Sequence, residues 1–230
     1  MAGTPGPLSA PPLLILLDLD NTLVDRAGAF RRWAELFAAE LGRPEEADFI
    51  VAEDRNGHTP RPRLAATLAS RFDLDSSPAA VSTLVERILY EHVEFVEVYD
   101  GLAEHLELLA DDGVRLAILS NGPVEQQGRK LRRTGIDARM VDTVVSQGVG
   151  LAKPDVRIFE FALERAGGDP SRTWMVGDDP VNDVAGGRGA GLRTGWVGHG
   201  TVWAERGDPL GPPTVEAATT REVLELIRSR

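Results

Sequence analysis

Two aspartates stand at the end of an apolar run near the start of the chain, in the stretch LLILLDLDNTLVD, residues 13–25. Asp18 and Asp20 follow directly on leucine and isoleucine side chains. Burying an ionised carboxylate costs free energy unless a cation or hydrogen-bond donors compensate for the lost water. The run before them is continuous rather than alternating, which is typical of a strand buried on both faces of a parallel sheet. The pattern therefore predicts two carboxylates at the carboxyl end of a buried strand.

Further polar residues stand next to other apolar runs of the same kind, which cover residues 115–119, 143–146, 173–176 and 194–197. These polar residues are Ser120, Asn121, Lys153, Asp178, Asp179 and Asp183. In open α/β sheets, ligands bind beyond the carboxyl ends of the strands. We therefore expect these side chains to meet Asp18 and Asp20 at one rim of a sheet.

Such a group of side chains has a definite chemistry. Carboxylates placed close together raise one another's pKa, and a divalent cation removes that conflict. Mg²⁺ typically binds a few carboxylates together with water and phosphate oxygens. Lys153 and loop N–H groups could complete a cradle for a phosphate group. The residues predict a Mg²⁺-dependent phosphoryl-transfer site.

Helical patterns separate the strand-like runs. Leucines at 102, 106 and 109 form one apolar stripe, and a second stripe starts at Ile158. Pro154 predicts the start of that second helix, because proline is favoured in a first helical turn. Strands that alternate with helices indicate an α/β fold, a doubly wound, Rossmann-like parallel sheet.

Residues 26–99 do not follow this rhythm. Apolar residues recur there at helical spacing, as in Phe30, Trp33 and Phe37, and Ser77-Pro78 predicts a helix start. We therefore expect an all-helical cap domain at 26–99 and a Rossmann-like catalytic core made of 13–25 and 100–230. The segment 1–12 is rich in Pro, Gly and Ala and is expected to be a disordered tail.

The composition restricts the possible partners. The 230 residues include 25 basic and 36 acidic side chains, a net charge of −11, which argues against a nucleic-acid or anionic-membrane surface. The absence of cysteine excludes disulfides and cysteine-ligated metals. The longest apolar run is too short to span a membrane, and the first residues do not resemble an export signal. A cytoplasmic protein is expected, with monomer and homodimer both open.

Four motifs, DLDNTLVD, LSNG, KP and GDDPVND, occur in this order. Together they resemble the motifs of the haloacid dehalogenase superfamily of hydrolases. The resemblance covers the chain from about Leu13 to Val197, and residues 26–99 resemble the cap that this family carries after its first motif. In this family the Rossmann-like core carries the catalytic residues.

The resemblance implies roles for the first and last motifs. Asp18 would be the nucleophile that becomes an aspartyl-phosphate. Asp20 would protonate the leaving oxygen and later take a proton from water. Thr22 would steady the motif through hydrogen bonds and contribute to substrate binding. Mg²⁺ would bind Asp18, the backbone carbonyl of Asp20, and Asp178.

It also implies roles for the middle motifs. Ser120 and the Asn121 backbone would hold the phosphoryl oxygens, and Lys153 would offset the charge of nucleophile and phosphate. Asp183 would orient Lys153 or a metal-bound water.

The acid at position 20 separates the subclasses of this superfamily. Phosphatases use an acid two residues after the nucleophile and dehalogenases do not, so Asp20 favours a phosphatase acting on a small phosphorylated metabolite. A phosphomutase of the same superfamily remains an alternative, and a 2-haloacid dehalogenase is disfavoured by Asp20 and Asp178. The polar segment EDRNGHTPRPR, residues 53–63, is either a solvated loop or a source of substrate contacts.

Overall fold

The computed structural model describes residues 13–203 and 211–229. The expected tail, residues 1–12, lies outside the described residues. Internal contacts divide the chain into two compact units. The first, called here the sheet unit, comprises Met1–Leu23, Asp100–Pro123 and Ile136–Arg230. The second, the helical unit, comprises Val24–Tyr99 and Val124–Gly135.

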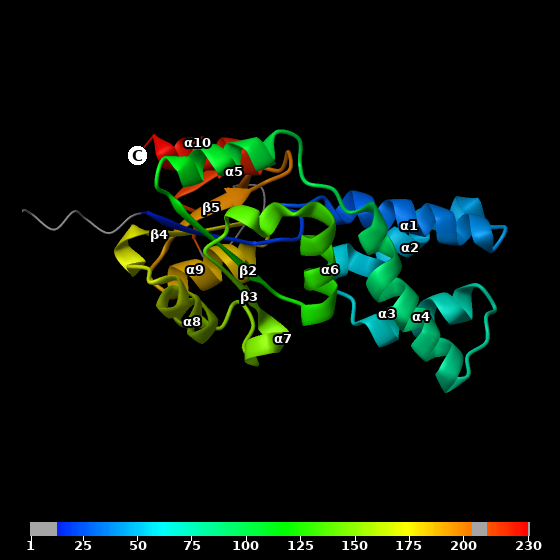
Figure 1. Cartoon of the computed structure of the whole chain (residues 1–230). Coiled ribbons are helices and arrows are strands. Elements are labelled where there is room, and N and C mark those ends of the chain that lie inside the picture. The colour runs from blue at the N-terminus through cyan, green and yellow to red at the C-terminus, as the bar shows by residue number, and fades with distance from the viewer. Residues whose placement is uncertain (1–12, 204–210, 230) are drawn as a thin grey trace, which may run out of the picture. The chain divides into compact units, whose positions relative to one another are not determined.

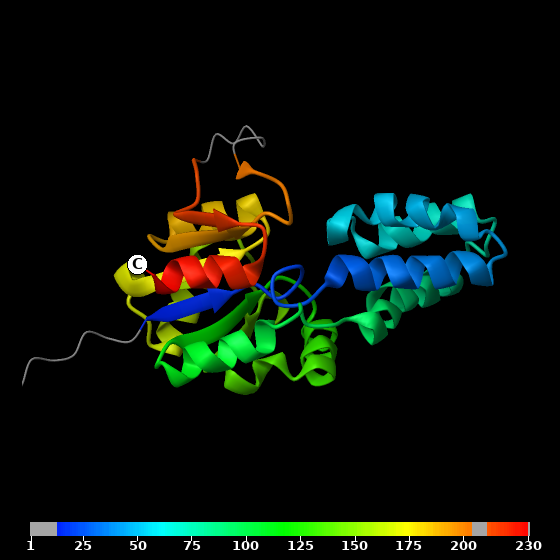
Figure 2. The same ribbon diagram turned by 90° about the horizontal axis from the view of Figure 1, so that it is seen from above.

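The sheet unit is built on six strands in the order β3-β2-β1-β4-β5-β6, and every neighbouring pair is parallel (Figure 2). The strands are β1 (Leu14–Leu17), β2 (Arg115–Ser120), β3 (Asp142–Val145), β4 (Thr173–Gly177), β5 (Arg193–Val197) and β6 (Val215–Ala217). All four residues of β1 are buried, as expected for a strand covered on both faces. The predicted α/β fold with a doubly wound parallel sheet is confirmed.

Helices cover both faces of this sheet. Helices α5 (Leu102–Asp111) and α10 (Thr220–Arg228) lie on one face, and α8 (Val156–Ala166) and α9 (Gly186–Gly189) lie on the other (Figure 1). A short helix, α7 (Ser146–Val149), follows β3. Leu14 and Leu16 pack in one core with Ile158 and Phe159 of α8. The alternation of side chains along β1 sends Ile15 and Leu17 to the opposite face.

The predicted helix start at Pro154 is wrong. Helix α8 begins at Val156, and Asp155 is its N-cap, with a carboxylate that accepts a hydrogen bond from Arg157 N at 3.0 Å. An aspartate cap satisfies a free N–H of the first turn, which proline cannot do. Lys153 and Pro154 therefore lie in the turn before the helix.

The helical unit has its own apolar core. Its helices are α1 (Arg26–Glu40), α2 (Ala47–Asp54), α3 (Arg61–Arg71), α4 (Pro78–Tyr90) and α6 (Val124–Thr134). Asp25, the third acid of the opening stretch, is the N-cap of α1 and accepts a hydrogen bond from Gly28 N at 2.8 Å. The rings of Trp33 and Phe37 stack within the core, with centroids 5.1 Å apart. Helix α2 had no counterpart among the expected helical patterns.

Short helical turns connect several of these helices and strands. Five are 3-10 turns: η1 (Pro44–Glu46), η2 (Arg55–Gly57), η3 (Glu91–Phe95), η4 (Ile136–Arg139) and η5 (Pro170–Arg172). A sixth, η6 (Pro180–Ala185), is a π-helical turn that follows β4. Within residues 13–203 and 211–229, every helix is too short or too polar to cross a membrane.

Candidate active site

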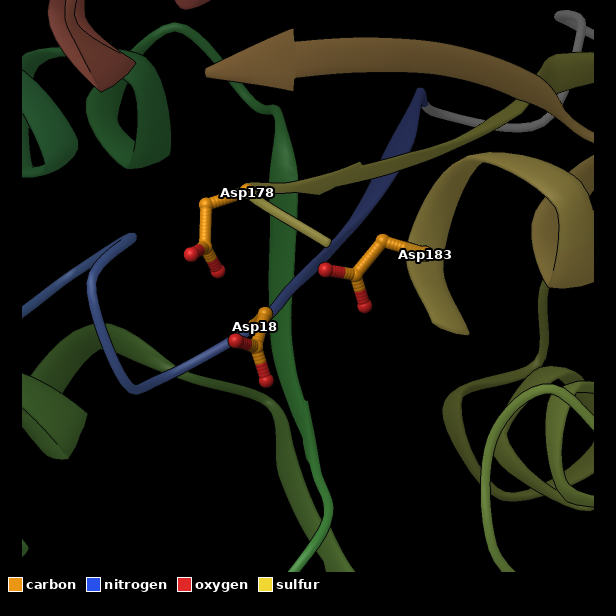
Figure 3. A group of neighbouring side chains, drawn as sticks. All are labelled: Asp18, Asp178 and Asp183. Carbon is orange, nitrogen blue, oxygen red and sulfur yellow. The ribbon is translucent and has the colours of Figure 1, made fainter. Parts of the chain in front are cut away.

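Three carboxylates converge beyond the carboxyl ends of two central strands. Asp18 follows β1, and Asp178 and Asp183 follow β4 (Figure 3). Each can offer one oxygen atom to a common point, and these oxygens lie within 4.8 Å of one another. The backbone of Asp18 continues the ladder of the sheet, because its N–H donates to the carbonyl of Val176 at 2.9 Å. The position of Asp18 is therefore fixed by the sheet itself.

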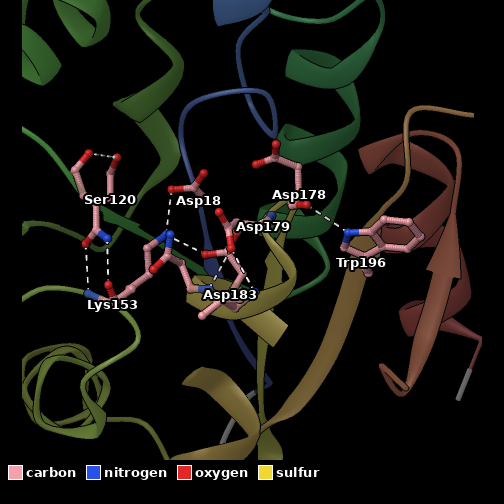
Figure 4. Close-up of polar contacts among 10 residues, drawn as sticks. Asp18, Ser120, Lys153, Asp178, Asp179, Asp183 and Trp196 are labelled. Atoms are coloured by element: carbon pink, nitrogen blue, oxygen red, sulfur yellow. Dashed lines mark hydrogen bonds and ion pairs between the residues drawn. The ribbon is translucent and has the colours of Figure 1, made fainter. Parts of the chain in front are cut away.

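Lys153 joins two of these carboxylates. Its Nζ donates to Asp18 Oδ1 and to Asp183 Oδ1, both at 2.7 Å (Figure 4). The lysine is only 4% exposed. Burial opposes its charge, but Asp18 and Asp183 outweigh burial and hold the pKa of Lys153 above its usual value. The ammonium therefore stays charged between the two carboxylates.

One lysine does not balance three carboxylates. Burial raises the pKa of Asp18 to about 7, with contributions from the charges of Asp183 and Asp20, although Lys153 acts against the shift. Burial and the charge of Asp18 raise the pKa of Asp178 to about 9. Burial also raises the pKa of Asp183 despite its bond to Lys153. A divalent cation fits this site, because carboxylate oxygens are the ligands that Mg²⁺ takes and its charge would restore the balance.

A glycine permits the close approach of Asp183. A Cβ atom added to Gly177 would lie 2.1 Å from Asp183 Oδ2, so that only glycine fits at the end of β4. Asp183 also accepts a hydrogen bond from Asp179 N at 3.0 Å. The carboxylate of Asp179 is used differently: it accepts from Val181 N and Asn182 N, both at 2.8 Å, and so caps the turn η6.

Asn121 holds Lys153 by its backbone. The amide Nδ2 of Asn121 donates to the carbonyl of Lys153, and Oδ1 of Asn121 accepts from the Lys153 N–H, both at 2.9 Å. Ser120 is buried next to it, with its Oγ 3.4 Å from the Asn121 carbonyl. The N–H of Gly122 donates to Ser146 Oγ at 2.9 Å. Sequence reasoning assigned a role to the backbone of Asn121 and missed the role of its side chain.

The turn after Asp18 carries Asp20, which is half-buried, and Thr22, which is fully buried. Within the described residues the hydroxyl of Thr22 has no hydrogen-bond partner. The Thr22 carbonyl accepts from Thr220 Oγ1 at 2.5 Å. In the same way Trp196 Nε1 donates to the Asp178 carbonyl at 2.9 Å (Figure 4). Trp196 and Thr220 lie outside the four motifs, and no signal in the sequence connected them to the site.

Known proteins resemble this chain along most of its length. The family model of the haloacid dehalogenase-like hydrolases matches residues 13–191. A phosphoserine phosphatase of Thermus thermophilus is 30% identical, over 91% of this chain and 97% of the relative. A glyceraldehyde 3-phosphate phosphatase of Methanothermobacter thermautotrophicus is 37% identical, over 84% of this chain and 88% of the relative.

Solved structures share the fold of this chain. The solved structure of the HAD-hydrolase YfnB of Bacillus subtilis, bound to magnesium, has a TM-score of 0.73 at 21% identity and covers 95% of this chain and 99% of its own. The chain belongs to the haloacid dehalogenase-like hydrolases. It is an enzyme, a phosphatase of this family.

Proposed function

We propose that the protein is a Mg²⁺-dependent phosphohydrolase that removes phosphate from a small phosphorylated metabolite through an aspartyl-phosphate at Asp18. One observation carries this proposal. A buried carboxylate at the end of the central strand is paired with Lys153 and shares a possible cation site with Asp178 and Asp183. The relatives named as phosphatases of phosphoserine and glyceraldehyde 3-phosphate support a small phosphorylated substrate.

Asp18 and Asp20 divide the reaction between them. A carboxylate oxygen of Asp18 attacks phosphorus, and the bond between phosphorus and the leaving oxygen breaks while Asp20 gives that oxygen a proton. Asp20, now a carboxylate, then takes a proton from the water that attacks the aspartyl-phosphate. Phosphate leaves and both side chains return to their starting states. Ser120 and the Asn121 backbone hold the phosphoryl oxygens, and Lys153 offsets their charge.

The cation would be held by the carboxylates of Asp18 and Asp178 and by the backbone carbonyl of Asp20. Bound there, Mg²⁺ supplies positive charge to the phosphoryl group and its nucleophile. Asp183 accepts a hydrogen bond from Lys153, which supports a role in orienting the lysine. The acid at position 20 favours phosphate transfer over dehalogenation.

The experiment is a phosphate-release screen over phosphorylated metabolites and aryl phosphates, with Mg²⁺ and with EDTA. We expect release that requires Mg²⁺. A quench with acid after mixing with a ³²P-labelled substrate should trap label on the protein, and hydroxylamine should remove it, because the bond is an acyl phosphate. Asp18→Asn should lose both the label and at least about a thousandfold in kcat. Undiminished activity of this variant would contradict the assignment of the nucleophile.

A further inference from the structure

The peptide that follows Asp20 has an unusual backbone conformation. Asn21 is buried, and its φ of 57° lies in the left-handed region. Most residues other than glycine avoid this region, and asparagine adopts it more readily than the others. The turn sets the direction in which the chain leaves Asp20. Contacts that hold the turn at Asn21 therefore restrain the backbone next to the Asp20 carboxylate.

His199 holds this turn from a distant part of the sequence. Its Nε2 lies 2.6 Å from the Asn21 carbonyl oxygen. A carbonyl can only accept, so Nε2 carries the proton and donates it. The contact joins residues 178 positions apart, both within the sheet unit.

The loop that carries His199 is itself anchored to the sheet edge. The N–H of Gly198 donates to the Ala217 carbonyl at 2.8 Å, and the N–H of His199 donates to the Ala218 carbonyl at 3.1 Å. His199 has a φ of 49°, also left-handed, and is exposed. An exposed side chain contributes little to the hydrophobic core. The hydrogen bond to Asn21 is therefore the feature that distinguishes this residue.

We propose that His199 is a positioning residue for the proton transfer of Asp20, acting through the Asn21 carbonyl. The inference rests on the proposed function, because it needs Asp20 as the acid. Without the imidazole, the turn at Asn21 loses one restraint and the Asp20 carboxylate no longer stays aligned with the leaving oxygen. The attack by Asp18, whose backbone is bonded to β4, is affected much less.

The separate roles of Asp18 and Asp20 can be distinguished by comparing two substrates. A general loss of structure would lower the activity on both substrates equally. An alkyl phosphate needs a proton on its leaving oxygen, whereas p-nitrophenyl phosphate has a leaving group that departs without one. His199→Asn should lower kcat/KM for the alkyl phosphate by about tenfold or more and for p-nitrophenyl phosphate by about threefold at most. The quantity to compare is kcat/KM, because it reports on the reaction up to the first irreversible step.

Two variants at position 199 distinguish the loss of the hydrogen bond to Asn21 from an effect of backbone strain. Asparagine tolerates the left-handed region but is too short to place its amide where Nε2 stands. Glutamine tolerates that region less well but can reach the carbonyl with its own amide. His199→Gln should therefore restore much of the alkyl phosphate activity even if it is the less stable protein. His105→Asn makes the same chemical change on α5 and should leave both substrates unaffected.

The outcomes are distinct. Equal losses for both substrates in His199→Asn, or no loss for either, would overturn the inference while leaving the proposed function in place. A wild-type protein that releases phosphate from neither substrate would contradict the proposed function instead. Even in that case, hydrogen exchange tests the contact between His199 and Asn21. The amides of residues 18–24 should exchange faster in His199→Asn than in wild type or His199→Gln. Unchanged exchange would also overturn the inference.

Discussion

Two buried ionic clusters in this chain have opposite charge balances. The site cluster consists of Asp18, Asp178, Asp183 and Lys153, three carboxylates and one cation. The helical-unit cluster is Asp54 between Arg26 and Arg61, one carboxylate and two cations.

The pKa values respond in opposite directions. In the site cluster, burial and neighbouring carboxylates raise the pKa values of the aspartates. Burial alone would also raise the pKa of Asp54, but Arg26 and Arg61 together hold it below its usual value. Asp54 is 1% exposed and also accepts a hydrogen bond from Gly57 N at 2.8 Å. In the helical-unit cluster the arginines balance the charge of the carboxylate. In the site cluster the carboxylates outnumber the cation, and a further cation would balance the excess.

The largest expected effect on folding is at Asp54. Asp54→Asn removes the only carboxylate of the helical-unit cluster and leaves two arginines against an amide. Breaking a buried ion pair from one side costs about 3–5 kcal/mol, so the free energy of unfolding in urea should fall by that amount. Asp48→Asn is the matched control, because Asp48 pairs with Arg31 at 2.7 Å on the exposed surface. That change should cost less than about 1 kcal/mol. Equal losses of unfolding free energy in the two variants would show that the buried pairs of Asp54 stabilise the fold no more than an exposed pair.

The same substitution in the site cluster should have the opposite sign. Asp178→Asn removes a carboxyl group whose pKa of about 9 forces the native state to take up a proton at pH 8, so in EDTA it should raise the free energy of unfolding by about 1–3 kcal/mol. If the proposed site binds Mg²⁺, the cation should stabilise the wild type by mass action, and the variant should lose most of that gain. Thermal unfolding with and without Mg²⁺ measures both effects. Asp111→Asn, in an exposed pair with Arg139 at 2.6 Å, is the control and should show neither. A destabilised Asp178→Asn protein in EDTA would contradict the proposed imbalance.

The most gradual expected effect is on the pH dependence of stability. The folded pKa values of Asp18 and Asp178, about 7 and about 9, lie above the ordinary value of 3.8, so the metal-free native state binds more protons than the unfolded chain between these limits. Stability in EDTA should therefore fall as pH rises above about 4, by about 1.4 kcal/mol per pH unit for each of these groups, until the fall ends near pH 7 for Asp18 and near pH 9 for Asp178. Asp54 has the opposite sign, since its contribution is lost only as pH falls below about 4.

Urea titrations at several pH values, in EDTA and in excess Mg²⁺, measure this slope. Mg²⁺ should flatten it, because the cation holds the carboxylates ionised in the native state, and Asp178→Asn should make it shallower in EDTA. A flat profile in EDTA would show that the site carboxylates are compensated without a cation.

The strands of the sheet unit were predictable because of their burial. A strand covered on both faces is a continuous apolar run, so β1 and β2 appear in the sequence to within one residue. The polar residues at the ends of these runs were predictable for the same reason, since the sheet brings those ends together. The predicted helix start at Pro154 was wrong because Asp155, one residue later, is the better N-cap.

The helical-unit cluster could not be predicted. Residues 53–63 look like a solvated loop or a substrate contact, yet Asp54 from that segment forms ion pairs with Arg61 of the same segment and with Arg26. Nothing in the sequence shows that one acid of this polar stretch is buried, because its partner stands 28 positions earlier. Trp196, His199 and Thr220 escaped notice for a similar reason. Each acts on a backbone carbonyl of another segment, and such contacts leave no spacing pattern.

The two hydrogen bonds between the Asn121 side chain and the Lys153 backbone limit which residues can replace Asn121 in a redesigned enzyme. The Asn121 amide presents a donor and an acceptor side by side to the N–H and carbonyl of Lys153. Glutamine offers the same pair one methylene further out, and aspartate offers only acceptors. A library that seeks new substrates should therefore keep Asn121 fixed, because an exchange there would displace Lys153, which pairs with Asp18.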